Sequence, residues 1–176
     1  MVYVFLADGF EEIEALAPVD ILRRAAVDVK TVSINDTLNV TGSHGITVRA
    51  DILLKDVCGD AQMLVLPGGM PGTLNLQKCA LLCDMLKKSE GFVAAICAAP
   101  SVLGGLGILK GKKATCYPGF EDKLEGAECV NEPVVVSGKT ITSRGAGTAH
   151  LFGFTLLSLL KGDDEAKKLR KTMMYE

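Results

Sequence analysis

Short apolar runs alternate with amphipathic stretches along the whole chain. The runs are too short for most helices and are typical of strands buried on both faces of a parallel sheet. They cover residues 2–7, 29–34, 63–66 and 92–96, with weaker patterns at 46–50 and 113–116. The pattern at 46–50 alternates and predicts a short edge strand. Residues 134–142, with Ser137-Gly138-Lys139 at their centre, predict a hairpin.

Segments with apolar residues at every third or fourth position lie between these runs and predict helices. They cover 11–26, 74–86, 98–109, 150–160 and 164–173. Pro18 lies inside the first segment, so we expect a kink or an early end of that helix. Strands that alternate with helices predict an α/β fold whose mainly parallel sheet is covered on both faces. No linker or repeat divides residues 1–176, which we expect to form one domain.

Composition and charge exclude several classes of protein. The chain has 176 residues, 48% of them hydrophobic, and a net charge of -2 without a basic block. Nucleic-acid binding and polybasic membrane anchoring therefore lack their usual electrostatic basis. Residues 91–109 carry no charge, but Pro100 and four glycines favour a strand, a turn and a helix over a membrane span. The N-terminus lacks the basic region of a signal peptide, so we expect a reducing cytoplasm.

Cys97 is the strongest candidate among six cysteines for a reactive group. It stands between a predicted strand and a segment of small residues, where a sharp strand-to-helix turn exposes the junction side chain as a nucleophile elbow. Ala95, Ala98 and Ala99 supply the small neighbours that such a turn needs. The start of a helix also favours a thiolate. The alternative is an inert, buried cysteine at the end of a core strand.

Two further strand ends carry groups that can assist a thiol. Gly68-Gly69 can present N–H groups that form an oxyanion hole with the N–H of Ala98, although a plain turn is the simpler interpretation. Glu11, Glu12 and Glu14 lie at the start of the first predicted helix. Negative charges are favourable at this end of the helix dipole, which is a sufficient reason for two of the three. Glu14 shares a face with Glu11, and an inward carboxyl beside a thiol can move a proton.

The sequence offers Cys97 no evident histidine base. His44 lies in a Gly-Ser-His-Gly loop and His150 lies early in a helix, and both are expected at the surface without a partner. Cys79 and Cys83 are four residues apart, but no second pair has the spacing of a structural zinc site. The chain contains neither a G-x-G-x-x-G nor a Walker motif. We therefore expect no metal and no cofactor.

Taken together, five segments resemble the ThiJ/PfpI superfamily, in the DJ-one-like branch of parkinsonism-associated deglycases and chaperones and their bacterial relatives. They follow one another in the order of that family and extend the resemblance over essentially the whole chain, to Met174-Tyr175-Glu176. The segments are residues 8–14, 18–20, 66–69, 94–100 and 142–148.

The resemblance implies a flavodoxin-like three-layer sandwich with a doubly wound sheet, similar to class I glutamine amidotransferases, and a homodimer. It implies that Cys97 is a nucleophile prone to oxidation, that Glu14 is its protonated partner, and that Gly69 and Ala98 are N–H donors. The candidate site comprises catalytic Cys97 and Glu14, with oxyanion or substrate contacts from Gly68, Gly69, Ala98, Tyr117 and Arg144.

Two positions depart from the pattern of the family. Some members carry a histidine where Tyr117 stands, and a phenol with a pKa of about 10 is a poor general base at neutral pH. This substitution leaves Glu14 as the evident proton shuttle. In the loop 42–45, the human branch carries an arginine where His44 stands. An anion or dimer contact at His44 is therefore either lost or dependent on pH.

We expect a cysteine-dependent, cofactor-independent glyoxalase or deglycase that acts on α-oxoaldehydes or on their protein and nucleotide adducts. The alternative is a redox-sensing chaperone gated by the oxidation of Cys97. A cysteine-dependent amidase or protease needs a base that the chain does not evidently supply. A role related to thiazole biosynthesis is a further, weaker reading of the resemblance.

Overall fold

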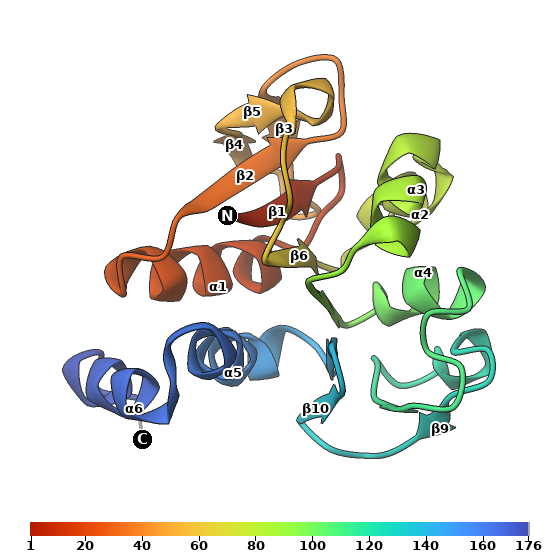
Figure 1. Ribbon diagram of the computed structural model, residues 1–176. Coiled ribbons are helices and arrows are strands. Elements are labelled where there is room, and N and C mark those ends of the chain that lie inside the picture. The colour runs from red at the N-terminus through yellow and green to blue at the C-terminus, as the bar shows by residue number, and fades with distance from the viewer. Residues whose placement is uncertain (176) are drawn as a thin grey trace.

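The computed structural model describes residues 1–175, and Glu176 of the C-terminal segment lies outside the described residues. Seven strands form the main sheet in the order β10-β11-β7-β6-β1-β2-β5 (Figure 1). All neighbours are parallel except β10 and β11, which form the expected antiparallel hairpin. The strands are β1 (Val2–Leu6), β2 (Val29–Ser33), β5 (Ile52–Leu53), β6 (Met63–Leu66), β7 (Phe92–Ile96), β10 (Val134–Ser137) and β11 (Thr140–Ser143).

Helices cover both faces of the sheet, which confirms the predicted α/β architecture (Figure 1). Side chains alternate along β1: Val4 packs with the helices of one face and Phe5 with those of the other. Burial on both faces explains why the strands are continuous apolar runs. One face carries α1 (Glu12–Arg24), α5 (Ala149–Lys161) and α6 (Asp163–Thr172), and the other carries α2 (Gly72–Lys78), α3 (Ala80–Lys88) and α4 (Pro100–Gly105).

The structure corrects three predictions about helices. The first helix does not end early, because α1 runs through Pro18 to Arg24, held by close packing against α5. The single helix predicted over 74–86 is two helices, since Cys79 takes an extended conformation between α2 and α3. The helix after Cys97 is α4 alone, which is shorter than the predicted segment 98–109.

Two predicted strands lie outside the main sheet. The pattern at 46–50 forms β4 (Thr47–Arg49), which pairs with β3 (Asn39–Thr41) in a separate antiparallel ribbon instead of at the edge of the sheet. The pattern at 113–116 forms β8 (Lys113–Ala114), which pairs with β9 (Glu128–Cys129). Three short 3-10 helices, η1 (Leu54–Asp56), η2 (Glu121–Lys123) and η3 (Ala146–Thr148), complete the described elements. Within residues 1–175, each helix is too short or too polar to cross a membrane.

Gly153 sets the distance between α1 and α5. A Cβ at Gly153 would lie 3.1 Å from the Pro18 Cα and 2.7 Å from the Ile21 Cδ1. We expect Gly153→Ala to lower the free energy of unfolding by about 1 kcal/mol, because an overpacking cost of about 1–3 kcal/mol outweighs about 1 kcal/mol of helix propensity. Denaturant unfolding measures this change. Gly105→Ala, at an open helical position, is the matched control and should leave stability equal or higher; equal losses in both variants would contradict the packing argument.

Candidate active site

Cys97 occupies a strained turn at the carboxyl end of β7. Its φ angle is +65°, a left-handed conformation that non-glycine residues rarely adopt and that recurs at functional turns. The turn is held by its backbone, since the Cys97 N–H donates to the Ser143 carbonyl at 2.9 Å and the Tyr117 N–H donates to the Cys97 carbonyl at 2.8 Å. The thiol is half-buried between β7 and the start of α4. This is the predicted elbow geometry.

Glu14 points from the first turn of α1 toward the thiol. Its side chain is 1% exposed, and its Oε2 accepts a hydrogen bond from the Gly68 N–H at 2.9 Å. The Ala146 N–H and the Cys97 side chain also act on the carboxyl and lower its pKa. Glu11 caps the helix by accepting from the Glu14 N–H at 2.7 Å, and its own N–H donates to the Gly68 carbonyl. The helix start and the Gly68 loop therefore fix the carboxyl beside the sulfur.

The glycine loop after β6 completes the surroundings of the sulfur. A Cβ at Gly68 would lie 2.6 Å from both the Cys97 Cβ and the Glu14 Oε2, so that only glycine fits there. Gly69 has a φ of +88°, which turns its backbone toward the site. The N–H groups of Gly69 and Ala98 both act on the Cys97 sulfur and lower the pKa of its thiol. These donors lie where an oxyanion on a carbon bound to that sulfur would form.

The protonation states of Glu14 and Cys97 depend on each other. Burial raises the pKa of Glu14 to about 7, and the charge of Glu11 adds to the rise. Burial, the negative charge of Glu14 and its hydrogen bond raise the pKa of Cys97 to about 12, which outweighs the lowering by the Ala98 and Gly69 N–H groups. The charge of Glu14 acts only when that carboxyl is ionised. A protonated Glu14 instead removes this repulsion and can donate to a thiolate.

Tyr117 and Arg144 lie at the margin of this arrangement. The Tyr117 side chain is 51% exposed, and its ring covers Gly145 at 3.4 Å from a Cβ built there. Arg144 hydrogen-bonds the Asn131 side chain and lines a separate cavity of about 330 Å³ with Cys116 and Glu121. Within residues 1–175, no polar contact joins the Arg144 side chain to Cys97 or Glu14. The structure therefore brings Cys97, Glu14, Gly68, Gly69 and Ala98 together, with Tyr117 beside them and Arg144 turned away.

Neither histidine contacts Cys97, but the expectation that both lack partners is wrong. The His44 Nδ1 lies 2.7 Å from the Glu12 Oε2, and the His150 ring stacks on Tyr175. Glu12 is buried at the start of α1 instead of standing free as a simple helix-dipole residue. No local signal in the sequence predicts the pair of Glu12 and His44, because it forms only when the β3–β4 ribbon folds back onto α1. All six cysteines are free thiols.

The fold and the strained cysteine turn place the protein among α/β proteins with the class I glutamine amidotransferase-like architecture. The chain belongs to the DJ-1/PfpI family, which matches residues 1–159, and within it to the DJ-1 branch. It is 35% identical to protein dj-1beta of Drosophila melanogaster over 97% of this chain and 95% of that protein. It is 34% identical to the "glutathione-independent glyoxalase DJR-1.2" of Caenorhabditis elegans, over 93% of this chain and 89% of that protein.

Other relatives are longer than this chain. The identity to protein DJ-1 homolog B of Arabidopsis thaliana is 42% over 94% of this chain, which spans only 39% of that protein. Among solved structures, oxidized Toxoplasma gondii DJ-1 matches with a TM-score of 0.95 and 38% identity, over 99% of this chain and 97% of that one. Drosophila melanogaster DJ-1beta matches with a TM-score of 0.96 and 34% identity, over the same shares. These likenesses confirm the predicted family and fold.

A methyl group at position 68 should disable the site without removing any reactive atom. In Gly68→Ala, the new Cβ meets the Cys97 Cβ and the Glu14 Oε2 at 2.6 Å, so one of the pair must move. We expect the alkylation rate of Cys97 to change severalfold, because the thiol and the carboxyl no longer keep their relative positions. Gly147→Ala is the matched control, since a Cβ there meets no atom within 4 Å. Equal rates in all three proteins would contradict the described packing.

The raised pKa of Glu14 makes a signed prediction about stability. Because this pKa lies near 7 in the folded protein and near 4.5 in the unfolded chain, the folded state binds more protons between these values. The stabilising contribution is therefore complete below about pH 4.5 and is lost as the pH rises through 7. In thermal unfolding, the unfolding temperature of the wild type should fall relative to that of Glu14→Gln as the pH rises over this range. Parallel curves would show that Glu14 has an ordinary pKa.

Proposed function

We propose that this protein is a cysteine-dependent, cofactor-independent glyoxalase that converts α-oxoaldehydes such as methylglyoxal into 2-hydroxy acids. The observation that carries the proposal is the pairing of a half-buried thiol with a buried carboxyl whose pKa is raised to about 7. A carboxyl whose pKa lies near 7 can both give and take a proton at physiological pH. The likeness to a relative named glutathione-independent glyoxalase supports the same reaction class.

The reaction begins when the Cys97 thiol passes its proton to ionised Glu14 and the sulfur adds to the aldehyde carbon, which forms a carbon–sulfur bond. The carbonyl electron pair moves to oxygen, where the N–H groups of Gly69 and Ala98 stabilise the charge until Glu14 returns that proton to the oxygen. Glu14 then removes the hydrogen of the former aldehyde carbon as a proton and delivers it to the neighbouring carbon. The hydroxyl proton passes to the oxygen of that neighbouring carbon, which produces the thioester of the 2-hydroxy acid. Water hydrolyses the thioester, releases the hydroxy acid and restores the thiol.

The same steps extend to deglycation, in which the aldehyde is bound as an adduct to a protein or nucleotide. Tyr117 stands at the rim of the site with half of its side chain exposed and can contact the part of the substrate beyond the reacting carbons. The Tyr117 phenol does not hydrogen-bond the sulfur within the described residues, which leaves Glu14 as the proton shuttle of this proposal.

The test is lactate formation from methylglyoxal in buffer without glutathione or another thiol. We expect lactate to accumulate with time and in proportion to protein concentration. Controls without protein, and with protein whose thiols are alkylated, account for scavenging by buffer and by surface lysine and arginine. Loss of methylglyoxal without lactate would contradict the glyoxalase proposal.

A second candidate function is a redox sensor or chaperone gated by the oxidation of Cys97. The half-buried thiol at a strained turn, with two N–H donors that can bind sulfinate oxygens, favours this alternative. Mass spectrometry after mild peroxide treatment separates the two functions. Gain of two oxygens at Cys97 alone, together with no aldehyde turnover, would favour the sensor. Oxidation of all six cysteines to the same extent would exclude it.

The proposal includes a homodimer in the cytoplasm, in line with the family resemblance. The apolar side chains of Ile13 on α1 and Ile46 beside β4 are about half exposed, as expected of residues that a second copy covers. Sedimentation or light scattering of the purified protein measures the oligomeric state. An amidase or protease is disfavoured, because neither imidazole of the described chain bonds to Cys97 or Glu14.

A further inference from the structure

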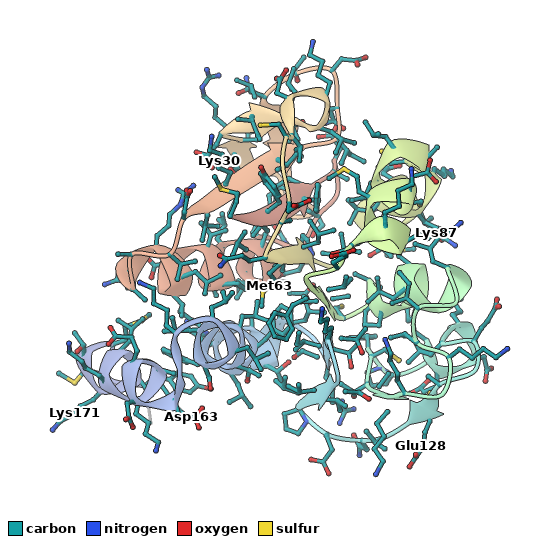
Figure 2. The ribbon with its side chains drawn as sticks, viewed as in Figure 1. Lys30, Met63, Lys87, Glu128, Asp163 and Lys171 are labelled. Atoms are coloured by element: carbon teal, nitrogen blue, oxygen red, sulfur yellow. The ribbon has the colours of Figure 1, made fainter. Side chains whose placement is uncertain are left out.

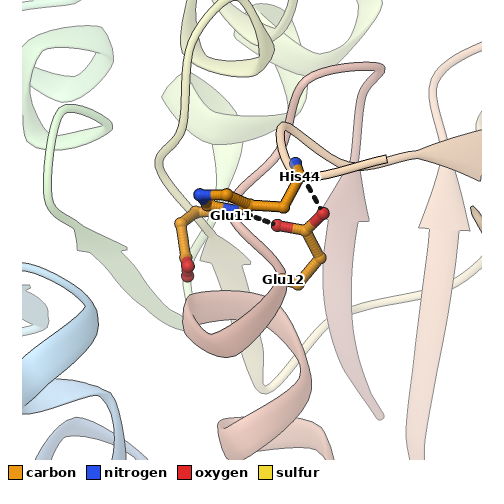
Figure 3. Close-up of side chains that lie close together, drawn as sticks. All are labelled: Glu11, Glu12 and His44. Atoms are coloured by element: carbon orange, nitrogen blue, oxygen red, sulfur yellow. Dashed lines mark hydrogen bonds and ion pairs between the residues drawn. The ribbon is translucent and has the colours of Figure 1, made fainter. Parts of the chain in front are cut away.

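A second group of polar side chains lies on the other side of the α1 start from Cys97. Glu11 and Glu12 come from the beginning of α1, and His44 comes from the loop that joins β3 to β4 (Figure 3). One ligand atom from each of the three residues lies within 4.8 Å of the other two. In the wider view of the side chains, α1 packs on one face of the sheet and α4 on the other (Figure 2). The cluster joins an imidazole nitrogen with two carboxylates, which is more than a run of acids at a helix end.

The position of the Glu12 carboxylate is fixed by the backbone of the loop. Its side chain is about 5% exposed, and its Oε1 accepts the His44 N–H at 2.8 Å. A Cβ at Gly42 would lie 2.3 Å from this oxygen, so the loop can approach only because residue 42 is glycine. The Ser43 N–H also donates to the Phe10 carbonyl at 2.8 Å. The donor atoms are therefore held in place by contacts that do not depend on a ligand.

The cluster carries excess negative charge. When the imidazole is neutral, the carboxylates of Glu11 and Glu12 give the cluster a charge of -2. The His44 Nδ1 and the Glu12 Oε2 lie 2.7 Å apart and share one proton in a hydrogen bond. Glu11 uses its Oε2 to cap the helix at Glu14, which leaves Oε1 for another partner. One imidazole and two carboxylates suit a transition cation such as Zn²⁺ or Co²⁺ better than Mg²⁺ or Ca²⁺, which prefer oxygen donors.

We propose that Glu11, Glu12 and His44 bind a divalent transition cation, with the His44 imidazole and one oxygen from each carboxylate as ligands. The cation takes the place of the proton between His44 Nδ1 and Glu12, and the neutral imidazole then carries its proton on Nε2. Water completes the coordination, as in other sites that have three protein ligands. In the single chain the His44 side chain is 68% exposed, so the imidazole is open to a cation before a second copy covers the neighbouring Ile13 and Ile46.

The experiment titrates metal-free protein with Co²⁺ under reducing conditions, by calorimetry and visible absorption. We expect one site, without the intense thiolate-to-cobalt absorption that a cysteine ligand would produce. His44→Ala and Glu11→Gln should each weaken binding at least about tenfold. The amide oxygen of Glu11→Gln can still accept the Glu14 N–H, so this variant keeps the helix cap. His150→Ala is the matched control and should bind as the wild type does.

Three results would overturn the proposal. They are absence of binding, unchanged affinity in His44→Ala, and thiolate absorption that places the cation on a cysteine. If cobalt binds as expected but methylglyoxal is not converted by any variant, the cation site stands and the proposed function fails.

Discussion

Cys97→Ser is expected to lower the rate of methylglyoxal conversion by at least about a thousandfold, to the level set by the remaining backbone donors. Serine keeps the shape of the elbow and the hydrogen bonds of its backbone, but its hydroxyl is a far weaker nucleophile than a thiolate. Initial rates of lactate formation without glutathione measure the effect. Intact mass and thermal unfolding show whether the variant has folded.

Cys83→Ser is the matched control for this prediction. Cys83 lies on α3, and within the described residues its thiol hydrogen-bonds the carbonyls of Gln77 and Leu76. We expect its rate to equal that of the wild type. If Cys97→Ser retained more than about a tenth of the parent rate, catalysis would not depend on a covalent thiol intermediate.

Glu14→Gln is expected to reduce turnover by about 10²–10⁴-fold, the usual contribution of a positioned general acid–base. The amide can still accept the Gly68 N–H, so the packing around the sulfur should persist. It cannot transfer a proton in either direction. The turnover number should therefore fall much more than the apparent affinity for substrate.

The alkylation rate of Cys97 distinguishes a chemical role of Glu14 from a structural one. In the wild type, we expect this rate to change as the pH passes through about 7, where Glu14 titrates. In Glu14→Gln, that transition should disappear and leave only the titration of the thiol. Asp20→Asn, an exposed change on the same helix, should retain the transition. A transition near 7 that persists in Glu14→Gln would assign it to another group.

The parts of the fold that local sequence determines were predictable. The apolar runs that form β1, β6 and β7 are buried on both faces, and the strand-to-helix turn at Cys97 follows from the small residues around it. The convergence of Glu14 and Gly68 on that turn follows from parallel strands, whose carboxyl ends meet at one edge of the sheet.

The remaining features depend on contacts between segments that are distant in the sequence. The ribbon of β3 and β4 folds onto α1, so the pairing of His44 with Glu12 has no local signature. α1 continues through Pro18 where it packs closely against Gly153, more than a hundred residues away along the chain. Arg144 follows β11 immediately, yet its hydrogen bond to Asn131 turns it toward a different cavity. Tertiary packing decides each of these outcomes.

The central claim is that Cys97 and Glu14 turn over an α-oxoaldehyde without any other thiol or cofactor. The most direct test follows carbon-13-labelled methylglyoxal, in large excess over the wild-type protein, by nuclear magnetic resonance in thiol-free buffer. The account predicts that lactate grows far beyond one equivalent per protein, until the methylglyoxal is consumed. Stoichiometric adducts, with lactate no higher than in buffer alone, would contradict it.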